Sequence, residues 1–333
     1  MKASIYDVAR QAGVSVVTVS RVINGVKTVR ASSKEKVFHA IETLGYQPSA
    51  AARSLAKGRT NVIGMLVPGL MDPFLMGVVK TADRALQQEG MFLALSVLES
   101  EEKEPAEWAN FLFQEDRVDG ILLLTPVNER ACVEQLKLKQ IPFVIIDNQL
   151  YPYTELSVVV DNYLGGYEAG KAFIETGHKQ IAHIGGPEDI QSANERCSGF
   201  LKALEEVGLE PFGLTRGEFS VEAGIRFVKE TISNGTLPDA IFTADDYIAF
   251  GVIDALRHAG FSVPEDVSVI GFDDHPFGSS LRPRLTTFAQ PAEELGETAV
   301  AMLMQRIRGE SKRHSVTKMP PKLIWRESVK ERI

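Results

Sequence analysis

Residues 5–25 read IYDVARQAGVSVVTVSRVING, a stretch with the pattern of two short helices joined by a tight turn. Ser4 and Asp7 stand at the spacing of a capping box, so we expect the first helix to begin there. Gly13 is expected to end this helix, and Ser15 can cap a second one. The stretch therefore predicts a helix-turn-helix.

The second of these helices is expected to read DNA. Val19 and Val22 form its inward face, which leaves Val16, Val17 and Arg21 free on the outside. A helix-turn-helix places the early residues of its second helix in the major groove of DNA. There Val16 and Val17 can touch thymine methyl groups, and Arg21 can reach a guanine edge.

A third helix is predicted shortly after this pair. Ser32 and Glu35 repeat the capping-box pattern, and we expect them to open it. Apolar residues between positions 37 and 44 then close a small core, and Gly45 ends the helix. The first 46 residues are thus expected to form a three-helix headpiece.

Charge divides the chain at about residue 59. Residues 1–59 carry ten Lys or Arg against three acidic residues, a net charge of +7, whereas the whole chain of 333 residues has a net charge of −8. The remainder therefore carries −15 and would be repelled by a polyanion. Because neutralisation of phosphates supplies most nonspecific affinity for DNA, nucleic-acid contact is expected only in the first segment.

The quoted stretch resembles the amino-terminal signature of the LacI/GalR family of transcription regulators. The next segment, LGYQPSAAARSLAKGRTNVIG at positions 44–64, is similar to that family's hinge. The resemblance implies that the hinge folds on operator DNA and that Leu55 wedges into the minor groove, where unstacking is offset by contacts to the kinked duplex. We take Arg53 and Lys57 as phosphate contacts. The predicted DNA-contacting residues are Ser4, Tyr6, Ser15, Val16, Val17, Thr18, Ser20, Arg21, Asn24, Arg53, Leu55 and Lys57.

From residue 61 onward, short apolar runs alternate with helical stretches, which is typical of parallel α/β sheets. The runs occur at 62–67, 91–97, 121–124 and 143–146, and again at 158–160, 181–184, 240–243 and 267–271. The resemblance extends over this region and implies two periplasmic-binding-protein-like lobes, with chain crossings near Asp161, Gln290 and Lys322. The predicted domains are a headpiece at 1–46, a hinge at 47–60, a first lobe at 61–160 and 291–321, and a second lobe at 161–290 and 322–333.

Ligands of open parallel sheets bind beyond the carboxyl ends of the strands, so a cleft between two lobes is the expected effector site. Carboxylates and a guanidinium suit the hydroxyls of a sugar, and an aromatic ring suits its apolar face. The resemblance places Phe74, Arg196, Phe219, Asp245 and Asp273 where family members contact their effector. The predicted effector-binding residues are Asp72, Phe74, Asp147, Arg196, Phe219, Asp245, Asp273 and Gln290. The alternative for an aspartate at a strand end is that it merely caps the next helix.

The sequence contains no complete motif of an enzyme active site. The segment GGYEAGKA at 165–172 approaches a phosphate-binding loop, but Ala172 lacks the hydroxyl that holds Mg²⁺, and a helix with Tyr167 and Lys171 on its surface explains it better. His275 follows two aspartates, a group that could be a metal cluster. We favour the alternative that these residues form a loop lining the cleft. Cys132 and Cys197 are expected to be inert core thiols. We therefore expect no enzyme, no metal and no cofactor.

The composition also bounds where the chain works. No apolar run approaches the roughly 20 residues that cross a bilayer, and the amino terminus has no secretory pattern, so a cytoplasmic protein is predicted. The sequence thus predicts a homodimeric repressor on pseudo-palindromic operator DNA, controlled by a small effector, expected to be a carbohydrate. A solute-binding receptor, a purine-responsive regulator and control by a phosphorylated carrier protein are the alternatives. The sequence does not name the particular sugar, and it does not tell whether the effector releases the repressor from DNA or recruits it to DNA.

Overall fold

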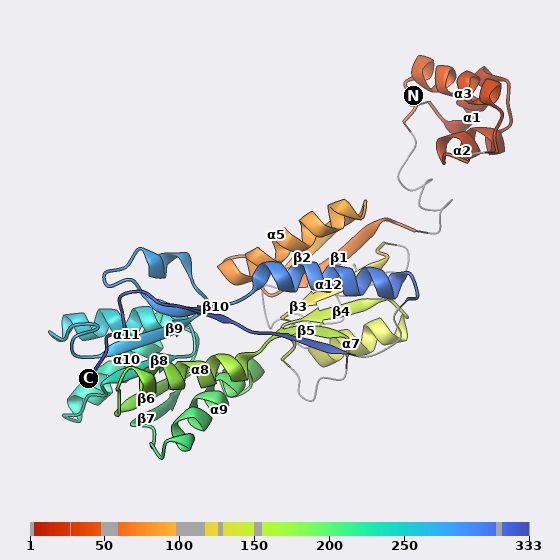
Figure 1. Cartoon of the computed structure of the whole chain (residues 1–333). Coiled ribbons are helices and arrows are strands. Elements are labelled where there is room, and N and C mark those ends of the chain that lie inside the picture. Colours follow the sequence, from red (N-terminus) through yellow and green to blue (C-terminus); the bar gives the residue numbers. More distant parts are fainter. Residues whose placement is uncertain are drawn as a thin grey trace. The chain divides into compact units, whose positions relative to one another are not determined.

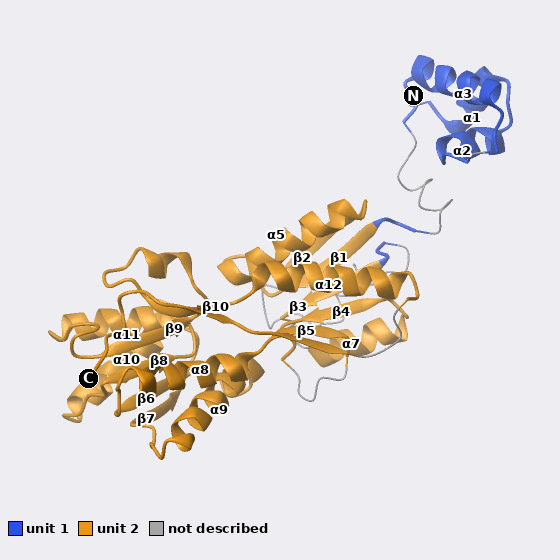
Figure 2. Ribbon diagram, viewed as in Figure 1, with its two compact units in different colours: residues 1–61, 116–119 blue, residues 62–115, 120–333 orange. Residues whose placement is uncertain are grey.

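The computed structural model describes residues 3–26, 28–47, 59–97, 117–125, 129–149, 155–310 and 315–332. The chain divides into two compact units, residues 1–61 with 116–119 and residues 62–115 with 120–333 (Figure 2). We call them the headpiece unit and the core. The mixed α/β fold class predicted from the sequence is confirmed.

The headpiece unit contains α1 (Ile5–Ala12), α2 (Val16–Ile23) and α3 (Ala31–Leu44). Ser4 and Asp7 make the predicted capping box, in which the Ser4 hydroxyl accepts from the Asp7 amide and the Asp7 carboxylate accepts from the Ser4 amide. Gly13 takes the left-handed conformation that ends α1, with φ of 64°. The hydrophobic cluster inside the headpiece unit consists of Val8, Ala9, Ala12, Val19, Val22, Val37 and Ala40.

The predicted start of α3 is wrong. The helix begins at Ala31, its N-cap is Arg30, and no side chain caps it. The amides of Ser33 and Lys34 both donate to the Arg30 carbonyl oxygen, at 3.1 Å each. Ser32 is therefore already helical and cannot take the extended conformation that an N-cap needs.

The prediction that Val16 stays free outside α2 also needs correction. Val16 is half-buried and packs against the headpiece core, whereas Val17 is 61% exposed. The reason is that the first turn of α2 packs against the small hydrophobic cluster formed by α1, α2 and α3. Of the two valines, Val17 alone has a largely exposed side chain.

The core holds two six-stranded sheets (Figure 1). The first sheet has the order β11-β5-β4-β3-β1-β2, and all of its strand pairs are parallel. Helices α5 and α12 pack together over one of its faces. Its elements are β1 (Val62–Val67), α5 (Pro73–Gln88), β2 (Phe92–Val97), β3 (Gly120–Leu124), α7 (Glu129–Leu138), β4 (Phe143–Ile146), β5 (Ser157–Val160), α12 (Ala292–Ile307) and β11 (Val316–Met319).

The second sheet has the order β12-β10-β9-β8-β6-β7, and only its β10–β12 pair is antiparallel. Because successive side chains of a strand point to opposite faces, Ile241 packs with α10 and α11 while Phe242 packs with α8 and α9. The elements are α8 (Asn162–Glu175), β6 (Ile181–Gly185), α9 (Gln191–Glu206), β7 (Gly213–Arg216), α10 (Val221–Ser233), β8 (Ala240–Thr243), α11 (Asp246–His258), β9 (Ser268–Phe272), the 3₁₀ helix η1 (Pro276–Ser279), β10 (Thr286–Ala289) and β12 (Lys322–Ile324).

We call the part of the core around the first sheet lobe 1 and the part around the second sheet lobe 2. The chain passes between them after β5, after β10 and after β11. The eight apolar runs named from the sequence are strands, within a residue or two at their ends. Strands β7, β10, β11 and β12 were not predicted. Among the described residues, no helix is long and apolar enough to cross a membrane.

Candidate functional site

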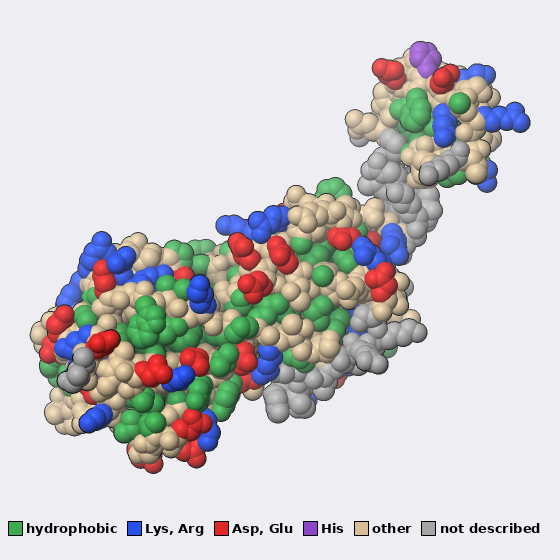
Figure 3. All heavy atoms as spheres, viewed as in Figure 1, with side chains coloured by type: hydrophobic (Ala, Val, Ile, Leu, Met, Phe, Trp, Pro, Cys, Tyr) green, Lys and Arg blue, Asp and Glu red, His purple; other side chains and the backbone are tan. Residues whose placement is uncertain are grey.

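The outer face of α2 is an exposed polar surface with one apolar side chain. Ser15 caps α2 by accepting from the Thr18 amide at 3.2 Å, and the two hydroxyls lie 2.9 Å apart. Val17 and Arg21 project from the same helix into solvent. Lys and Arg side chains are scattered over the visible face of the headpiece unit (Figure 3). This surface can contact both bases and phosphates.

The remaining predicted DNA contacts fall into two groups. Tyr6 is 68% exposed on the headpiece surface. Ser20 and Asn24 are half-buried, and Asn24 Nδ2 donates to the Ser20 hydroxyl at 3.4 Å. The other three predicted contacts, Arg53, Leu55 and Lys57, lie outside the described residues.

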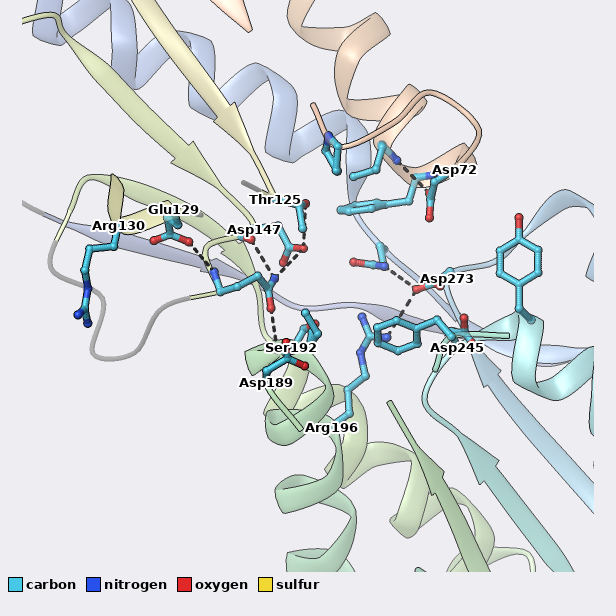
Figure 4. A pocket seen from close by; sticks show the side chains of 18 of the residues that line it. Asp72, Thr125, Glu129, Arg130, Asp147, Asp189, Ser192, Arg196, Asp245 and Asp273 are labelled. Carbon is cyan, nitrogen blue, oxygen red and sulfur yellow. Dashed lines mark hydrogen bonds and ion pairs between the residues drawn. The ribbon is translucent and has the colours of Figure 1, made fainter. Parts of the chain in front are cut away.

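A pocket of about 1160 Å³ lies between lobe 1 and lobe 2 of the core (Figure 4). Its walls include all eight residues predicted to bind an effector: Asp72, Phe74, Asp147, Arg196, Phe219, Asp245, Asp273 and Gln290. Six of them lie just beyond β1, β4, β8, β9 and β10, as expected for the carboxyl edges of parallel strands. The other two are Arg196, on α9 after β6, and Phe219, in the loop after β7. The structure thus brings together residues up to 218 positions apart, from Asp72 to Gln290.

Arg196 is positioned by a close contact between α8 and α9. A Cβ on Gly166 would lie 1.9 Å from the Arg196 carbonyl oxygen, and one on Gly199 would lie 2.0 Å from that of Tyr163. Glycine at both places lets the two helix backbones approach each other. The segment 165–172 that approaches a phosphate-binding loop is therefore part of α8, and Gly166 serves helix packing.

The guanidinium of Arg196 is held on several sides. It stacks 3.7 Å above the Phe272 ring, donates from Nε to Asn162 Oδ1 at 2.9 Å, and donates from Nη1 to the Ala244 carbonyl oxygen at 2.5 Å. Its Nη1 also lies 3.8 Å from Asp273 Oδ1. Because the side chain is only 6% exposed, it is fixed before any ligand arrives.

Two carboxyl groups of the pocket, those of Asp147 and Asp245, are buried, and that of Asp273 is half-buried beside Arg196. Burial raises the pKa of Asp147 to about 6 and that of Asp245 to about 7. Burial also raises the pKa of Asp273 well above its ordinary value, although the Arg196 guanidinium opposes the shift. Gln290 Nε2 donates to Asp273 Oδ1 at 2.6 Å. Ligand hydroxyl groups that donate hydrogen bonds to these carboxyl groups would stabilise their ionised, accepting form.

Two of the aspartates cap helices as well as line the pocket. Asp72 Oδ1 accepts from the Phe74 and Leu75 amides at the start of α5. Asp245 Oδ1 accepts from the Ile248 amide at 2.8 Å at the start of α11. Capping and ligand contact are compatible here, since each carboxylate has a second oxygen.

Backbone strain gathers at the pocket. Asp147 has φ of 54°, Asp273 of 113° and Thr125 of 41°, all in the region that side chains rarely adopt. Each residue follows a strand directly or by one position. Strain of this kind persists where the surrounding structure holds a functional side chain in place, which supports a binding role for these loops.

Several pocket residues were not predicted from the sequence. They include Thr125, Glu129, Arg130, Gln149, Asp189, Ser192 and Tyr247. Thr125 and Gln149 follow buried strands in the same way as the predicted aspartates, and that position was a usable signal. The others lie on helices or longer loops, where the sequence carries no such mark. Among the described residues no His, Cys, Asp and Glu cluster could hold a metal ion.

Comparison with known proteins agrees with both halves of the structure. Residues 4–49 match the family described as bacterial regulatory proteins, lacI family, and residues 171–329 match the periplasmic binding protein-like domain. The HTH-type transcriptional repressor PurR of Photobacterium profundum is 36% identical over 99% of both chains. The chain belongs to the LacI family.

Two solved structures of transcription regulators resemble the chain over nearly all of its length. A lac repressor dimer bound to operator and the anti-inducer ONPF is 28% identical, with a TM-score of 0.87 over 99% of this chain and 100% of that one. The transcriptional regulator CelR in complex with cellobiose is 31% identical, with a TM-score of 0.74 over 98% and 99%. This LacI-family chain is a DNA-binding transcriptional repressor with a periplasmic-binding-protein-like core, and it is not an enzyme.

Proposed function

We propose that this repressor is controlled by an unphosphorylated carbohydrate that binds in the pocket between the two lobes. The observation that carries the proposal is the excess of hydrogen-bond acceptors there: seven carboxyl groups line the pocket against the two guanidinium groups of Arg130 and Arg196. Sugar hydroxyls are donors and fit such a wall, whereas a phosphate group would be repelled by it.

Aromatic side chains supply the second feature that a sugar needs. Phe219 is 37% exposed, and a Cβ on Gly186 would lie 2.5 Å from its ring, so glycine there leaves room for the ring. Phe74 lines the pocket from lobe 1 and Phe219 from lobe 2. A pyranose can place its apolar face on such rings. CelR, a structural relative, is described in complex with cellobiose.

A purine is the second candidate effector. It is favoured by the full-length similarity to several repressors named PurR. A free purine base offers few hydrogen-bond donors to so many carboxyl groups. This point favours the carbohydrate.

The rest of the proposal concerns the assembly. The headpiece reads one half-site, so two headpieces related by two-fold symmetry are needed for a pseudo-palindromic operator. We therefore propose a homodimer, in which Val17 and Arg21 contact bases and Arg53 and Lys57 contact phosphates. A repressor of this kind acts where the chromosome is, so the proposed location is the cytoplasm.

A thermal-shift screen tests the effector class. The panel contains cellobiose, other unphosphorylated mono- and disaccharides, one sugar phosphate, guanine and hypoxanthine. A ligand at 100 times its Kd stabilises the protein by about 2.7 kcal/mol, which raises the melting temperature by several degrees. Phe219→Ala should remove the shift, while Trp325→Ala, which changes a 53% exposed aromatic residue outside the pocket, should keep it. Stabilisation by the purines and by no sugar would refute the carbohydrate.

The ligand found in the screen then tests the switch. Arg196→Ala should abolish the effect of that ligand on operator affinity and leave operator binding without ligand intact. Thermodynamic reciprocity requires operator DNA to change the ligand's affinity by the same factor. Equal ligand affinity with and without operator, measured by calorimetry, would contradict the coupling.

A further inference from the structure

Helix α9 begins without a capping side chain of its own. The other helices of lobe 2 are each capped from within: Asp161 caps α8, Ser220 caps α10 and Asp245 caps α11. The N-cap of α9 is Ile190, which has no side-chain hydrogen bond to offer. Since the first amides of a helix lack partners inside it, α9 needs an acceptor from elsewhere.

That acceptor comes from the other lobe. The side-chain oxygen of Gln149, just beyond β4 in lobe 1, accepts from the Ser192 amide in the first turn of α9 at 3.1 Å. The Gln149 Nε2 donates in turn to the Asp147 carbonyl oxygen at 2.9 Å and to Asp147 Oδ2 at 3.1 Å. The backbone amide of Gln149 donates to Glu129 Oε2 at 3.0 Å. The dashed lines in Figure 4 that reach Glu129, Asp147 and Ser192 mark these bonds.

The bond between Gln149 and Ser192 spans the effector pocket, because both residues line it. Ser192 lies four residues before Arg196, which is about one helical turn and thus on the same side of α9. A shift of α9 relative to lobe 1 therefore moves Arg196 and, at the same time, breaks the hydrogen bond between Gln149 and Ser192. A second contact from lobe 1 to α9 joins Lys318 Nζ and Glu195 Oε1 at 3.8 Å; the Lys318 side chain is 42% exposed and the Glu195 side chain 11% exposed.

We propose that Gln149 is a positioning residue of the effector response: it caps α9 across the pocket only when the lobes are close, and so links closure of the cleft to the placement of Arg196. The inference rests on the proposed effector switch. Opening the cleft leaves the Ser192 amide without its acceptor and frees the side-chain oxygen of Gln149, while Gln149 Nε2 can keep its bonds to Asp147. The arrangement favours the closed lobes before any ligand is present.

The test needs no ligand, so its failure is distinct from failure of the effector proposal. Gln149→Ala removes the bridge, and Gln149→Asn keeps the amide chemistry but is one methylene too short to span it. Each is combined with Ile190→Ser, which supplies α9 with a cap of its own. Lys318→Met is the matched control, because it removes a different contact between lobe 1 and α9 and leaves the bridge in place.

Two measurements are made on each full-length variant. Hydrogen exchange at the Ser192 amide reports the cap. The distance between spin labels on cysteines introduced at Gln88 in α5 and Lys229 in α10, both exposed, reports the separation of the lobes. Labelled chains are diluted with unlabelled chains so that only distances within one chain contribute. Cys132 and Cys197 are 1% and 3% exposed, so they are not expected to take up label.

Both Gln149 variants should exchange Ser192 roughly five- to tenfold faster and should raise the population with separated lobes by a similar factor, which is the worth of one hydrogen bond. Ile190→Ser should then restore the exchange rate and leave the lobes separated, while Lys318→Met should change neither. Unchanged label distances in both Gln149 variants would overturn the proposal. Restoration of the distances by Ile190→Ser would overturn it as well, because the bridge would then be only a helix cap.

Discussion

The headpiece unit and the effector pocket are built in opposite ways. The headpiece takes its helices and core from residues 4 to 46, carries its caps within three or four positions of the residues they serve, and is basic. The pocket takes its walls from segments scattered between residues 68 and 290 and is acidic. Local patterns are thus sufficient for the first region, whereas the second depends on the pairing order of two sheets.

Glycine has a different role in each of the two regions. In the headpiece, Gly13 ends α1 because its φ of 64° suits a residue without Cβ, and nothing lies within 4 Å of a Cβ built there. In lobe 2, Gly166 is required because α9 occupies the space. One position is set by its own backbone, and the other by a helix 30 residues away in the sequence.

The largest expected effect separates these two glycines. Gly166→Ala forces α8 and α9 apart and should lower the free energy of unfolding of the core by about 3 kcal/mol or more, since a backbone oxygen cannot give way as a side chain can. Gly13→Ala meets only the cost of the left-handed conformation, about 1–2 kcal/mol, and in the headpiece alone. Neither of the two tryptophans of the chain belongs to the headpiece unit, so unfolding of that unit is not what tryptophan fluorescence follows in urea. A fluorescence midpoint lowered equally by both variants would contradict the contrast.

The second prediction concerns the acidic pocket, where a buried carboxyl group should make the stability of the core depend on pH. Burial raises the pKa of Asp245 from 3.8 to about 7. The folded protein therefore keeps a proton that the unfolded chain has lost, so the stability from this group is full below pH 4 and falls as the pH rises to about 7. Asp245→Asn keeps the helix cap and carries no charge. It should be more stable than the wild-type core by roughly 2–4 kcal/mol at pH 8 and equal to it near pH 4.

The comparison explains what could be predicted from the sequence. Val62–Val67 and Phe143–Ile146 were found to the residue because continuous apolar runs mark buried parallel strands. Aspartates after such runs were placed in the pocket by the rule that ligands bind at the carboxyl edge. This reasoning needs only one strand at a time.

Gln149 shows where such reasoning ends. Its partner Ser192 lies 43 positions away on a different lobe, and the need for it arises only because Ile190 stands where a capping side chain is usual. The prediction that Ser32 caps α3 is wrong for a local reason. Ser-x-x-Glu also occurs inside helices, and the backbone before α3 becomes helical two residues earlier than the motif predicts. The motif states what a helix start contains, not where the start lies.

The third effect concerns DNA. Arg21→Ala should relax base preference at one position of the operator half-site and cost roughly 1–3 kcal/mol of specific binding. Lys57→Ala should weaken binding to all sequences alike and lower the dependence of affinity on salt. Titrations of a set of single-base operator variants at several salt concentrations distinguish the two. A uniform loss for Arg21→Ala would show that this side chain contacts phosphate.

The smallest effect compares two serines that the same motif places at helix starts. Ser4→Ala removes a hydroxyl that accepts from the Asp7 amide at 3.4 Å and donates to Asp7 Oδ2 at 2.7 Å, and should lower headpiece stability by about 1 kcal/mol. Ser32 is exposed within the first turn of α3, so Ser32→Ala should change stability by less than about 0.5 kcal/mol, with any change favourable because alanine is the better helix former. Far-UV circular dichroism during thermal unfolding of both variants measures the difference. Equal losses would mean that Ser32 caps α3 in solution, and the local motif would then outweigh the backbone geometry seen at Arg30.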